Sequence, residues 1–354
     1  MIVLLLLATS VLSDAYAGQA TRARPKPGEL IPPAATAPLS APRVFQIGHM
    51  RPEGADGPLT EDWFRRLKRF LESDLAETSF GLRGALASER YSGIAIVSAE
   101  GFNDLVRRME IKWPAGLDCV FCPSLAYVRE PSFDKDYEVV FQLKGPYDRG
   151  SADRGTGRYI LRKGVIFVNS HHPLFSWPRS PGEKVPLALL AESFASSAVA
   201  VISSYSAAGY FYPCKELLSA GKRVEPRQPI FCGSSQEVVK MVLSDVVSMG
   251  VCEEGAIEDL LQRAAITTPA EQIAQIVHTT TGAPTDPVVF RRHLGPAHSD
   301  LGRRFKEAVN EFFRIDRPGQ VRLEDSNDEA FRDLLQAWID YQSITQEIES
   351  VEAH

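Results

Sequence analysis

The sequence lacks the short motifs that mark several common enzyme classes. Its 354 residues contain no G-x-S-x-G, no H-E-x-x-H and no G-x-x-x-x-G-K-[ST] segment. These are the signatures of serine hydrolases, zinc peptidases and P-loop nucleotide-binding proteins. Histidine is also scarce, with seven in the chain, and the one adjacent pair, His171 and His172, would point to opposite faces of a strand. We therefore expect no enzyme activity, no cofactor and no metal.

Excess positive charge is absent as well. The formal net charge is −6, so the composition does not indicate a surface for nucleic acid or for an anionic membrane. The apolar run in the first twelve residues is too short to span a bilayer, and no later run is long enough. No short-period repeat is visible, which argues against a solenoid or a propeller. The composition is that of an ordinary globular protein, with 44% hydrophobic and 24% charged residues.

The N-terminus has the pattern of an export signal. An apolar run extends from Met1 to Leu12, and Ala15-Tyr16-Ala17 fits the small-x-small cleavage rule, although no Lys or Arg precedes the run. Residues 18–42 then hold six Pro and six Ala, which is typical of an extended linker. We expect a signal peptide at 1–17, a linker at 18–42, and a soluble periplasmic or otherwise extracytoplasmic protein after cleavage. The alternative is an N-terminal core strand.

Five cysteines are present, so at least one has no partner within the chain. Cys119 and Cys122 have a spacing that also occurs in redox and metal sites. However, L-D-C-V-F-C predicts a strand, in which three residues span about 10 Å and place the two side chains on opposite faces. A disulfide needs Cα atoms within about 7 Å, so we expect small buried thiols.

Strand-like and helix-like segments alternate along the chain, which predicts an α/β fold with mixed, mostly parallel sheets flanked by helices. Two amphipathic helices should end it, at 301–313 and from 328 to about 348. The expected strands are 43–49, 94–97, 117–121, 137–143, 159–168, 199–202, 273–279 and 287–291, and the other expected helices are 60–75, 102–109, 186–196 and 236–247.

Small hydroxyl-bearing residues follow several of the predicted strands. In such sheets, ligands bind beyond the carboxyl ends of the strands, where the first turn of a helix offers free N–H groups. The turns predict an anion site, with ordinary N-caps as the alternative explanation. Asp286, in A-P-T-D-P, is either an acid that faces the ligand or a turn residue before proline. The residues concerned are Ser124, Ser204, Tyr205, Ser206, Ala207, Ala208, Ser235 and Thr280.

Several segments together resemble one family, the phosphonate/phosphite/phosphate-type substrate-binding proteins of ABC transporters. The resemblance covers about residues 90–295 and implies a two-lobed type II periplasmic-binding-protein fold. The lobes would comprise 43–140 plus 285–354, and 141–284. The matching segments are D-C-V-F-C-P-S-L-A-Y-V, V-I-S-S-Y-S-A-A-G-Y-F-Y-P, F-C-G-S-S-Q-E-V-V-K-M-V-L, M-G-V-C-E-E-G-A and G-A-P-T-D-P-V-V-F.

The resemblance also implies roles for individual residues. The aromatic residue of the family site corresponds to Phe102, its tyrosine to Tyr127 with Ser124 before it, and its acid to Asp286. The Ser-Thr-Ser clamp corresponds to Ser206-Ala207-Ala208, so two hydroxyls are replaced by methyl groups, and the family histidine corresponds to Ser235. Each lost charge-assisted side-chain bond is worth about 1.5–3 kcal/mol. Backbone N–H groups survive these replacements.

The resemblance implies an extracytoplasmic solute-binding protein, expected to be a monomer. It would hold a small oxyanion in an interlobe cleft and deliver it to an ABC permease or a membrane sensor kinase. Two alternatives stay open. One is a ligand-binding or signalling module with a degenerate site, or with a thiol-based one, since some relatives bind arsenite through a cysteine and Cys122 would be the residue here. The other is an enzyme on the same fold.

Overall fold

The structure is a computed structural model. It describes residues 43–51, 60–112, 115–129, 136–145, 149–150, 160–177, 184–218, 225–267, 269–294, 299–316 and 321–352. The expected signal peptide and linker lie outside these residues.

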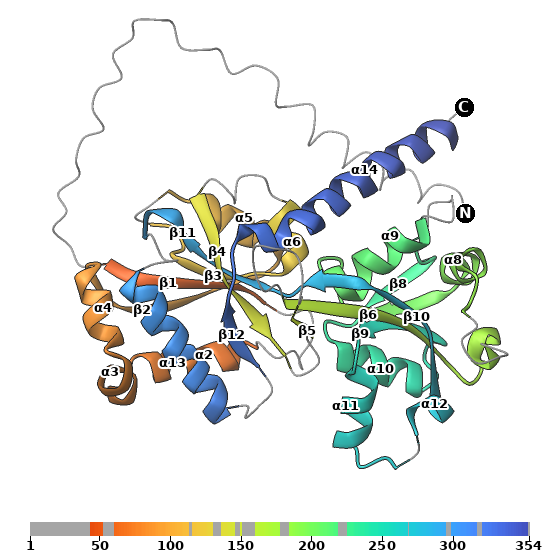
Figure 1. Cartoon of the computed structure of the whole chain (residues 1–354), viewed down its shortest axis with the longest axis horizontal. Helices are drawn as coiled ribbons and strands as arrows, with labels where there is room; N and C mark the ends of the chain where they lie inside the picture. Colours follow the sequence, from red (N-terminus) through yellow and green to blue (C-terminus); the bar gives the residue numbers. More distant parts are fainter. Residues whose placement is uncertain are drawn as a thin grey trace, which may run out of the picture. The chain divides into compact units, whose positions relative to one another are not determined.

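The first sheet has the strand order β12-β4-β11-β3-β1-β2 (Figure 1). Its strands come from both ends of the described chain, so the C-terminal part returns to the sheet that the N-terminal part begins. We call this sheet and the helices packed on it the first lobe. The strands are β1 Arg43–Met50, β2 Tyr91–Ala99, β3 Cys119–Phe121, β4 Tyr137–Lys144, β11 Pro287–Arg291 and β12 Arg322–Asp325.

The second sheet has the order β10-β6-β9-β7-β8, with β5 paired to β6. All of its strands come from the middle of the chain, and this sheet with its helices is the second lobe. The strands are β5 Arg149–Gly150, β6 Ile160–Asn169, β7 Ala198–Val201, β8 Gln228–Phe231, β9 Met249–Glu253 and β10 Ala274–Pro284.

Both sheets are mixed, but the expectation that parallel pairs dominate is wrong. Six of the ten described strand pairs are antiparallel, and four are parallel. The physical reason lies in the connections between the lobes. The strands that leave or re-enter a sheet, such as β4, β6, β10 and β11, run against their neighbours, whereas strands linked through helices run parallel.

The helices start where the sequence offers capping side chains. Thr60 caps α2 and Ser73 caps the next helix, each by accepting the N–H three residues on. The expected single helix over 60–75 is therefore two helices, because Ser73 is extended and cannot continue the first one. The helices are α2 Glu61–Leu71, α3 Asp74–Phe80, α4 Leu82–Ser88, α5 Phe102–Glu110, α6 Ser124–Arg129, α8 Leu187–Ser196, α9 Tyr212–Leu218, α10 Ser235–Leu243, α11 Ala256–Arg263, α12 Ala270–Ile273, α13 Asp300–Asp316 and α14 Arg332–Glu352. Shorter helical turns are η1 Pro173–Ser176, the π-helical η2 Ala207–Phe211, η3 Arg292–Leu294 and η4 Asp328–Phe331.

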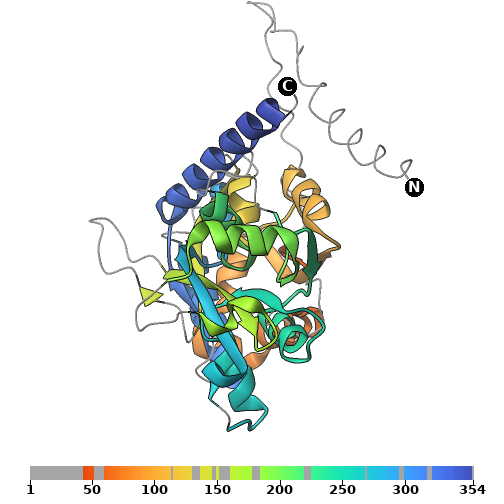
Figure 2. The ribbon, with the colours of Figure 1, turned by 90° about the vertical axis from the view of Figure 1, so that its right-hand side faces the viewer.

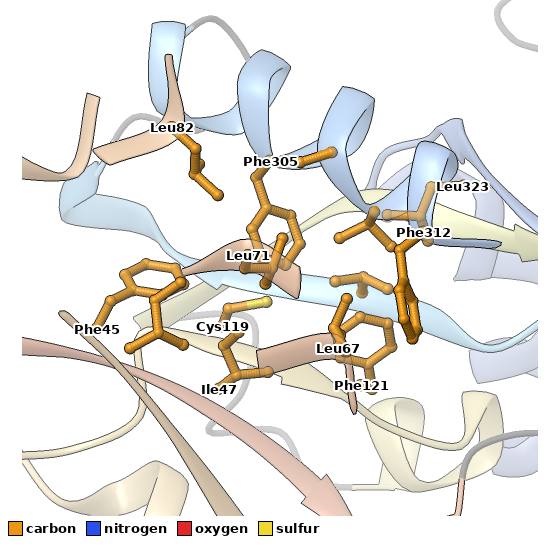
Figure 3. Close-up of a cluster of buried hydrophobic side chains, with 14 of the residues drawn as sticks. Phe45, Ile47, Leu67, Leu71, Leu82, Cys119, Phe121, Phe305, Phe312 and Leu323 are labelled. Carbon is orange, nitrogen blue, oxygen red and sulfur yellow. The ribbon is translucent and has the colours of Figure 1, made fainter. Parts of the chain in front are cut away.

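One face of the first sheet carries an apolar core under α2, α4 and α13. Figure 3 shows side chains of β1, α2 and α13 meeting around Cys119 and Phe121 of β3. Trp63 and Phe305 are fully buried there or nearly so. The wide apolar stripe of α13 is thus covered by the first sheet, as its pattern requires.

The opposite face of the first sheet packs against α5, α6 and the start of α14, and this cluster also takes in the beginning of η2 from the second lobe. In both views α14, in dark blue, runs past α6 (Figures 1 and 2). Two further apolar clusters cover the two faces of the second sheet. Within the described ranges, no helix is long and apolar enough to cross a membrane.

The cysteines are separate thiols, as the strand geometry predicted. Cys119 lies in the core under α2 and α13, whereas Cys122 lies in the cluster on the other face of the sheet. All five cysteines are free, and four of them are buried.

Candidate functional site

The predicted site residues divide between the two lobes, and two aromatic rings bring the lobes into contact. Phe102 opens α5, directly after the turn that follows β2. Tyr205 lies in the turn between β7 and η2. Their ring centroids are 4.7 Å apart. The structure therefore brings together the first aromatic residue and the Ser204–Ala208 turn, which are about a hundred residues apart in the sequence.

The start of η2, two residues after Tyr205, offers backbone N–H donors. Ser206 is extended, with φ −78° and ψ 114°, and its Oγ accepts the N–H of Gly209. Among the described residues, no acceptor is placed on the N–H groups of Ala207 and Ala208. A buried N–H without a partner is costly, and an anion would supply the missing acceptor.

The methyl groups of this turn lie against the first lobe. Ala207 and Ala208 are 4% and 5% exposed and belong to the apolar cluster that includes Leu125 and Val128 of α6. Gly164 of β6 lies behind the turn, where a Cβ would be 2.0 Å from the carbonyl oxygen of Ala208. A glycine at this position lets β6 support the turn closely.

Asp286 reaches the start of α6. Its Oδ1 accepts the N–H of Ser124 at 3.0 Å, and the Ser124 side chain is buried. The Asp286 carboxylate thus accepts the backbone N–H of Ser124, a donor that the sequence analysis assigned to the ligand. Burial raises the pKa of the Cys122 thiol and the charge of Asp286 raises it further, so this thiol stays protonated at neutral pH.

Tyr127 directs its hydroxyl away from solvent. The OH group donates to Asp328 Oδ1 at 2.8 Å, and the same oxygen accepts the N–H of Val139 at 2.8 Å. Asp328 Oδ2 accepts from Arg292 at 2.7 Å. Burial raises the pKa of Tyr127, and Asp328 raises it further. Tyr127 therefore joins α6 to η4 as well as lining the interlobe cluster.

Ser235 and Thr280 make hydrogen bonds within the second lobe. Ser235 Oγ accepts the N–H of Glu253 at 3.2 Å. Thr280 Oγ1 accepts the N–H of Gly164 at 2.9 Å and donates to the Thr281 carbonyl. Both side chains are buried. By contrast, Ser204 and Tyr205 are half-buried, and their hydroxyls have no partner among the residues that the structure describes.

One residue near the turn escaped the sequence reasoning. Arg129, at the end of α6, places its guanidinium carbon 5.2 Å from the Tyr205 ring and 5.8 Å from the Phe102 ring. The ring of Trp338, on α14, is 4.7 Å from the same carbon. In the sequence, Arg129 is a single arginine two residues after Tyr127, with no motif around it. Its surroundings become visible only in the fold, which brings the three rings to it.

The fold occurs in solved structures of other proteins. The XAC2383 protein of Xanthomonas citri, bound to chloride ion or to ATP, matches with a TM-score of 0.55 and 13% identity, over 86% of this chain. The match covers 99% of the chloride-bound chain and 98% of the ATP-bound chain. PhnD1 from Prochlorococcus marinus, in complex with methylphosphonate, matches with a TM-score of 0.52 and 12% identity, over 85% of this chain and 99% of that one. The expected two-lobed periplasmic-binding-protein fold is confirmed.

The sequence itself matches one family. A search of curated proteins finds no match. The model of the family described as "ABC transporter, phosphonate, periplasmic substrate-binding protein" matches residues 118–336. This stretch covers more than half of the chain and includes α6, the η2 turn and the start of α14. The chain belongs to the family of periplasmic substrate-binding proteins of ABC phosphonate transporters.

Proposed function

We propose that this protein captures a small oxyanion, phosphonate-like or phosphite-like, between its two lobes for an ABC importer or a membrane sensor. The observation that carries the proposal is the start of η2. There the N–H groups of Ala207 and Ala208 have no acceptor among the described residues, and the adjacent Tyr205 meets Phe102 of the other lobe. The loss of two clamp hydroxyls leaves these backbone donors as the main anion contacts.

The proposed ligand site includes Phe102, Tyr205 and Ser204 as lining and Ser206–Ala208 as the anion-binding turn. Thr280 supports this turn from within the second lobe. Its Oγ1 accepts the N–H of Gly164, which packs against Ala208. The proposed contribution of Thr280 is to hold the donors in place.

A thermal-shift screen of the full chain tests the proposal. The panel is phosphite, phosphate, methylphosphonate, 2-aminoethylphosphonate, a simple alkanesulfonate and arsenite. We expect at least one phosphorus or sulfur oxyanion to raise the Tm in a concentration-dependent manner, because a ligand that binds only the folded state stabilises it. The absence of any shift at millimolar anion would refute the proposal.

A second candidate function is a partner-binding or signalling module with a degenerate anion site. The specific observation in its favour is the burial of Ala207 and Ala208 in an apolar cluster shared by the two lobes. The same screen separates the candidates, since a degenerate site predicts no anion-dependent shift. The alternative of a thiol-based site that binds arsenite gains no support from Cys122, because burial raises the pKa of its thiol.

An enzyme on the same fold is also disfavoured by geometry. A Ser–His contact exists in the second lobe, where Ser193 Oγ lies 3.1 Å from His172 Nε2. However, His172 Nδ1 accepts the N–H of Leu174, so Nε2 carries the proton and donates to the serine. A general base needs the opposite arrangement, with Nε2 accepting the serine proton.

We further propose that the protein is exported and that Met1–Ala17 is removed. The support is the apolar run followed by Ala15-Tyr16-Ala17, together with the family to which the chain belongs. N-terminal sequencing of the secreted or periplasmic protein should give a start near Gly18. An intact Met1 on protein from the cytosolic fraction would contradict the proposal.

A further inference from the structure

Arg129 lies at the point where three separate parts of the chain converge. Its guanidinium is surrounded by Phe102 from the start of α5, Tyr205 from the turn before η2, and Trp338 from α14, at 4.7–5.8 Å from each ring centroid. Tyr205 belongs to the second lobe and immediately precedes Ser206, the cap of the proposed anion-binding turn. The side chain therefore projects from the first lobe to the edge of the second.

The guanidinium has no anionic partner among the residues that the structure describes. Other arginines of the first lobe, such as Arg108 with Asp104, form ion pairs at ordinary distances. Arg129 is half-buried and makes no described hydrogen bond or ion pair. Aromatic faces offset part of the desolvation of a cation, but they cannot accept the N–H bonds at the edge of the guanidinium, which carries five donors.

Two acidic groups that contact α6, the helix that Arg129 ends, are already engaged. Asp286 accepts the N–H of Ser124, and Asp328 accepts from Tyr127, Val139 and Arg292. A positively charged group on a ligand would thus be repelled by Arg129. Neither Asp286 nor Asp328 would compensate for this repulsion, because both already accept hydrogen bonds from the protein. An oxyanion, by contrast, fits a guanidinium edge in a bidentate manner.

We propose that Arg129 is a ligand-binding residue that supplies the positive charge for the bound oxyanion and selects against ligands that carry an amine. The inference rests on the function proposed above. The ligand class is then a phosphonate or sulfonate whose substituent is apolar and uncharged, with the rings of Phe102, Tyr205 and Trp338 against that substituent. Arg129 thereby replaces the side-chain donors that Ala207 and Ala208 no longer provide.

The test uses the full chain, calorimetry and three probes: methylphosphonate, phenylphosphonate and 2-aminoethylphosphonate. The wild type should bind the first two more tightly than the third. Arg129→Gln should weaken methylphosphonate binding by about 10- to 100-fold, which corresponds to the loss of charge-assisted bonds. Arg129→Lys should recover part of that loss, because lysine keeps the charge but not the planar fork.

Arg107→Gln is the matched control, since Arg107 is an exposed arginine on α5 for which the structure describes no hydrogen bond or ion pair. It removes one positive charge and should leave the affinities unchanged. Trp338→Phe adds a second readout, because loss of a ligand-induced fluorescence change in this variant places the ligand near α14. Urea unfolding of each variant identifies any that fails to fold.

The outcomes are distinguishable. If the wild type binds none of the probes, nor any anion of the wider panel, the proposed function fails and the role of Arg129 fails with it. If the wild type binds methylphosphonate and Arg129→Gln binds it equally well, the role of Arg129 is refuted while the function stands. Preferential binding of 2-aminoethylphosphonate by the wild type would overturn the proposed selectivity.

Discussion

Replacing Ala207 with proline removes one backbone donor from the proposed anion site and little else. Ala207 is the first residue of η2, where the N–H has no described acceptor. Proline is well tolerated at a first helical position because its fixed φ suits the helix. The residue before it, Ser206, is already extended, as a residue before proline must be. The substitution therefore breaks none of the described hydrogen bonds of the protein.

The expected magnitude follows from that geometry. Loss of one N–H bond to a charged ligand should weaken anion binding by about 1–3 kcal/mol. The free energy of unfolding without ligand should change by less than about 1 kcal/mol, because the folded protein loses no bond and the unfolded chain becomes less flexible. The effect should thus appear in binding and not in stability.

Glu61→Pro is the matched control. Glu61 is the first residue of α2, and its cap Thr60 is extended and accepts the N–H of the third helical residue, as Ser206 does in η2. The assay is calorimetric titration with the tightest anion of the panel, together with urea unfolding of both variants. Unchanged affinity in Ala207→Pro, with wild-type stability, would refute the assignment of this donor to the ligand.

Three further predictions concern groups around the site. Tyr127→Phe should lower the free energy of unfolding by about 1–2 kcal/mol, because Asp328 loses a donor; a larger effect on anion affinity than on stability in urea unfolding would instead place the hydroxyl on the ligand. Burial opposes ionisation of Glu216, but bonds from His278 and Thr281 lower its pKa. The ionised Glu216 therefore contributes its full stabilisation of the folded protein at pH values above its ordinary pKa of 4.5. This contribution is lost as the pH falls through the lowered pKa. Glu216→Gln should cost about 1–3 kcal/mol at pH 7, and equal stabilities at pH 7 would contradict this. Gly164→Ala should destabilise by about 1–3 kcal/mol, because its Cβ would meet the Ala208 carbonyl. Gly84→Ala, on the exposed side of α4, should not; equal Tm values for these two variants would show that the close approach is unimportant.

Local patterns predicted many of the elements whose side chains are apolar and continuous, although β9, with four of its five residues buried, was not among the expected strands. The strand at 287–291 is found where expected as β11, and all five of its residues are buried. The strands β8 and β12 escaped prediction because only one of their eight residues, Leu323, is fully buried. Whether such a half-exposed segment forms a strand depends on its pairing with distant strands, and a single short segment does not encode that pairing.

The site shows the same limit. Strand ends and small turns directed attention to Ser206 and its neighbours, and the cap that Ser206 forms on η2 is local chemistry of this kind. The contact of Asp286 with Ser124 joins residues 162 positions apart. The position of Arg129 depends on three rings from other parts of the chain. These features arise from tertiary packing, so the sequence could name their residue types but not their partners.

Calorimetric titration of the full-length wild-type protein with methylphosphonate, phosphite and an alkanesulfonate tests the central claim most directly. The account predicts saturable binding of at least one of them, with one anion per chain and a matching rise in Tm. No heat of binding and no change in Tm with any of these anions at millimolar concentration would contradict it.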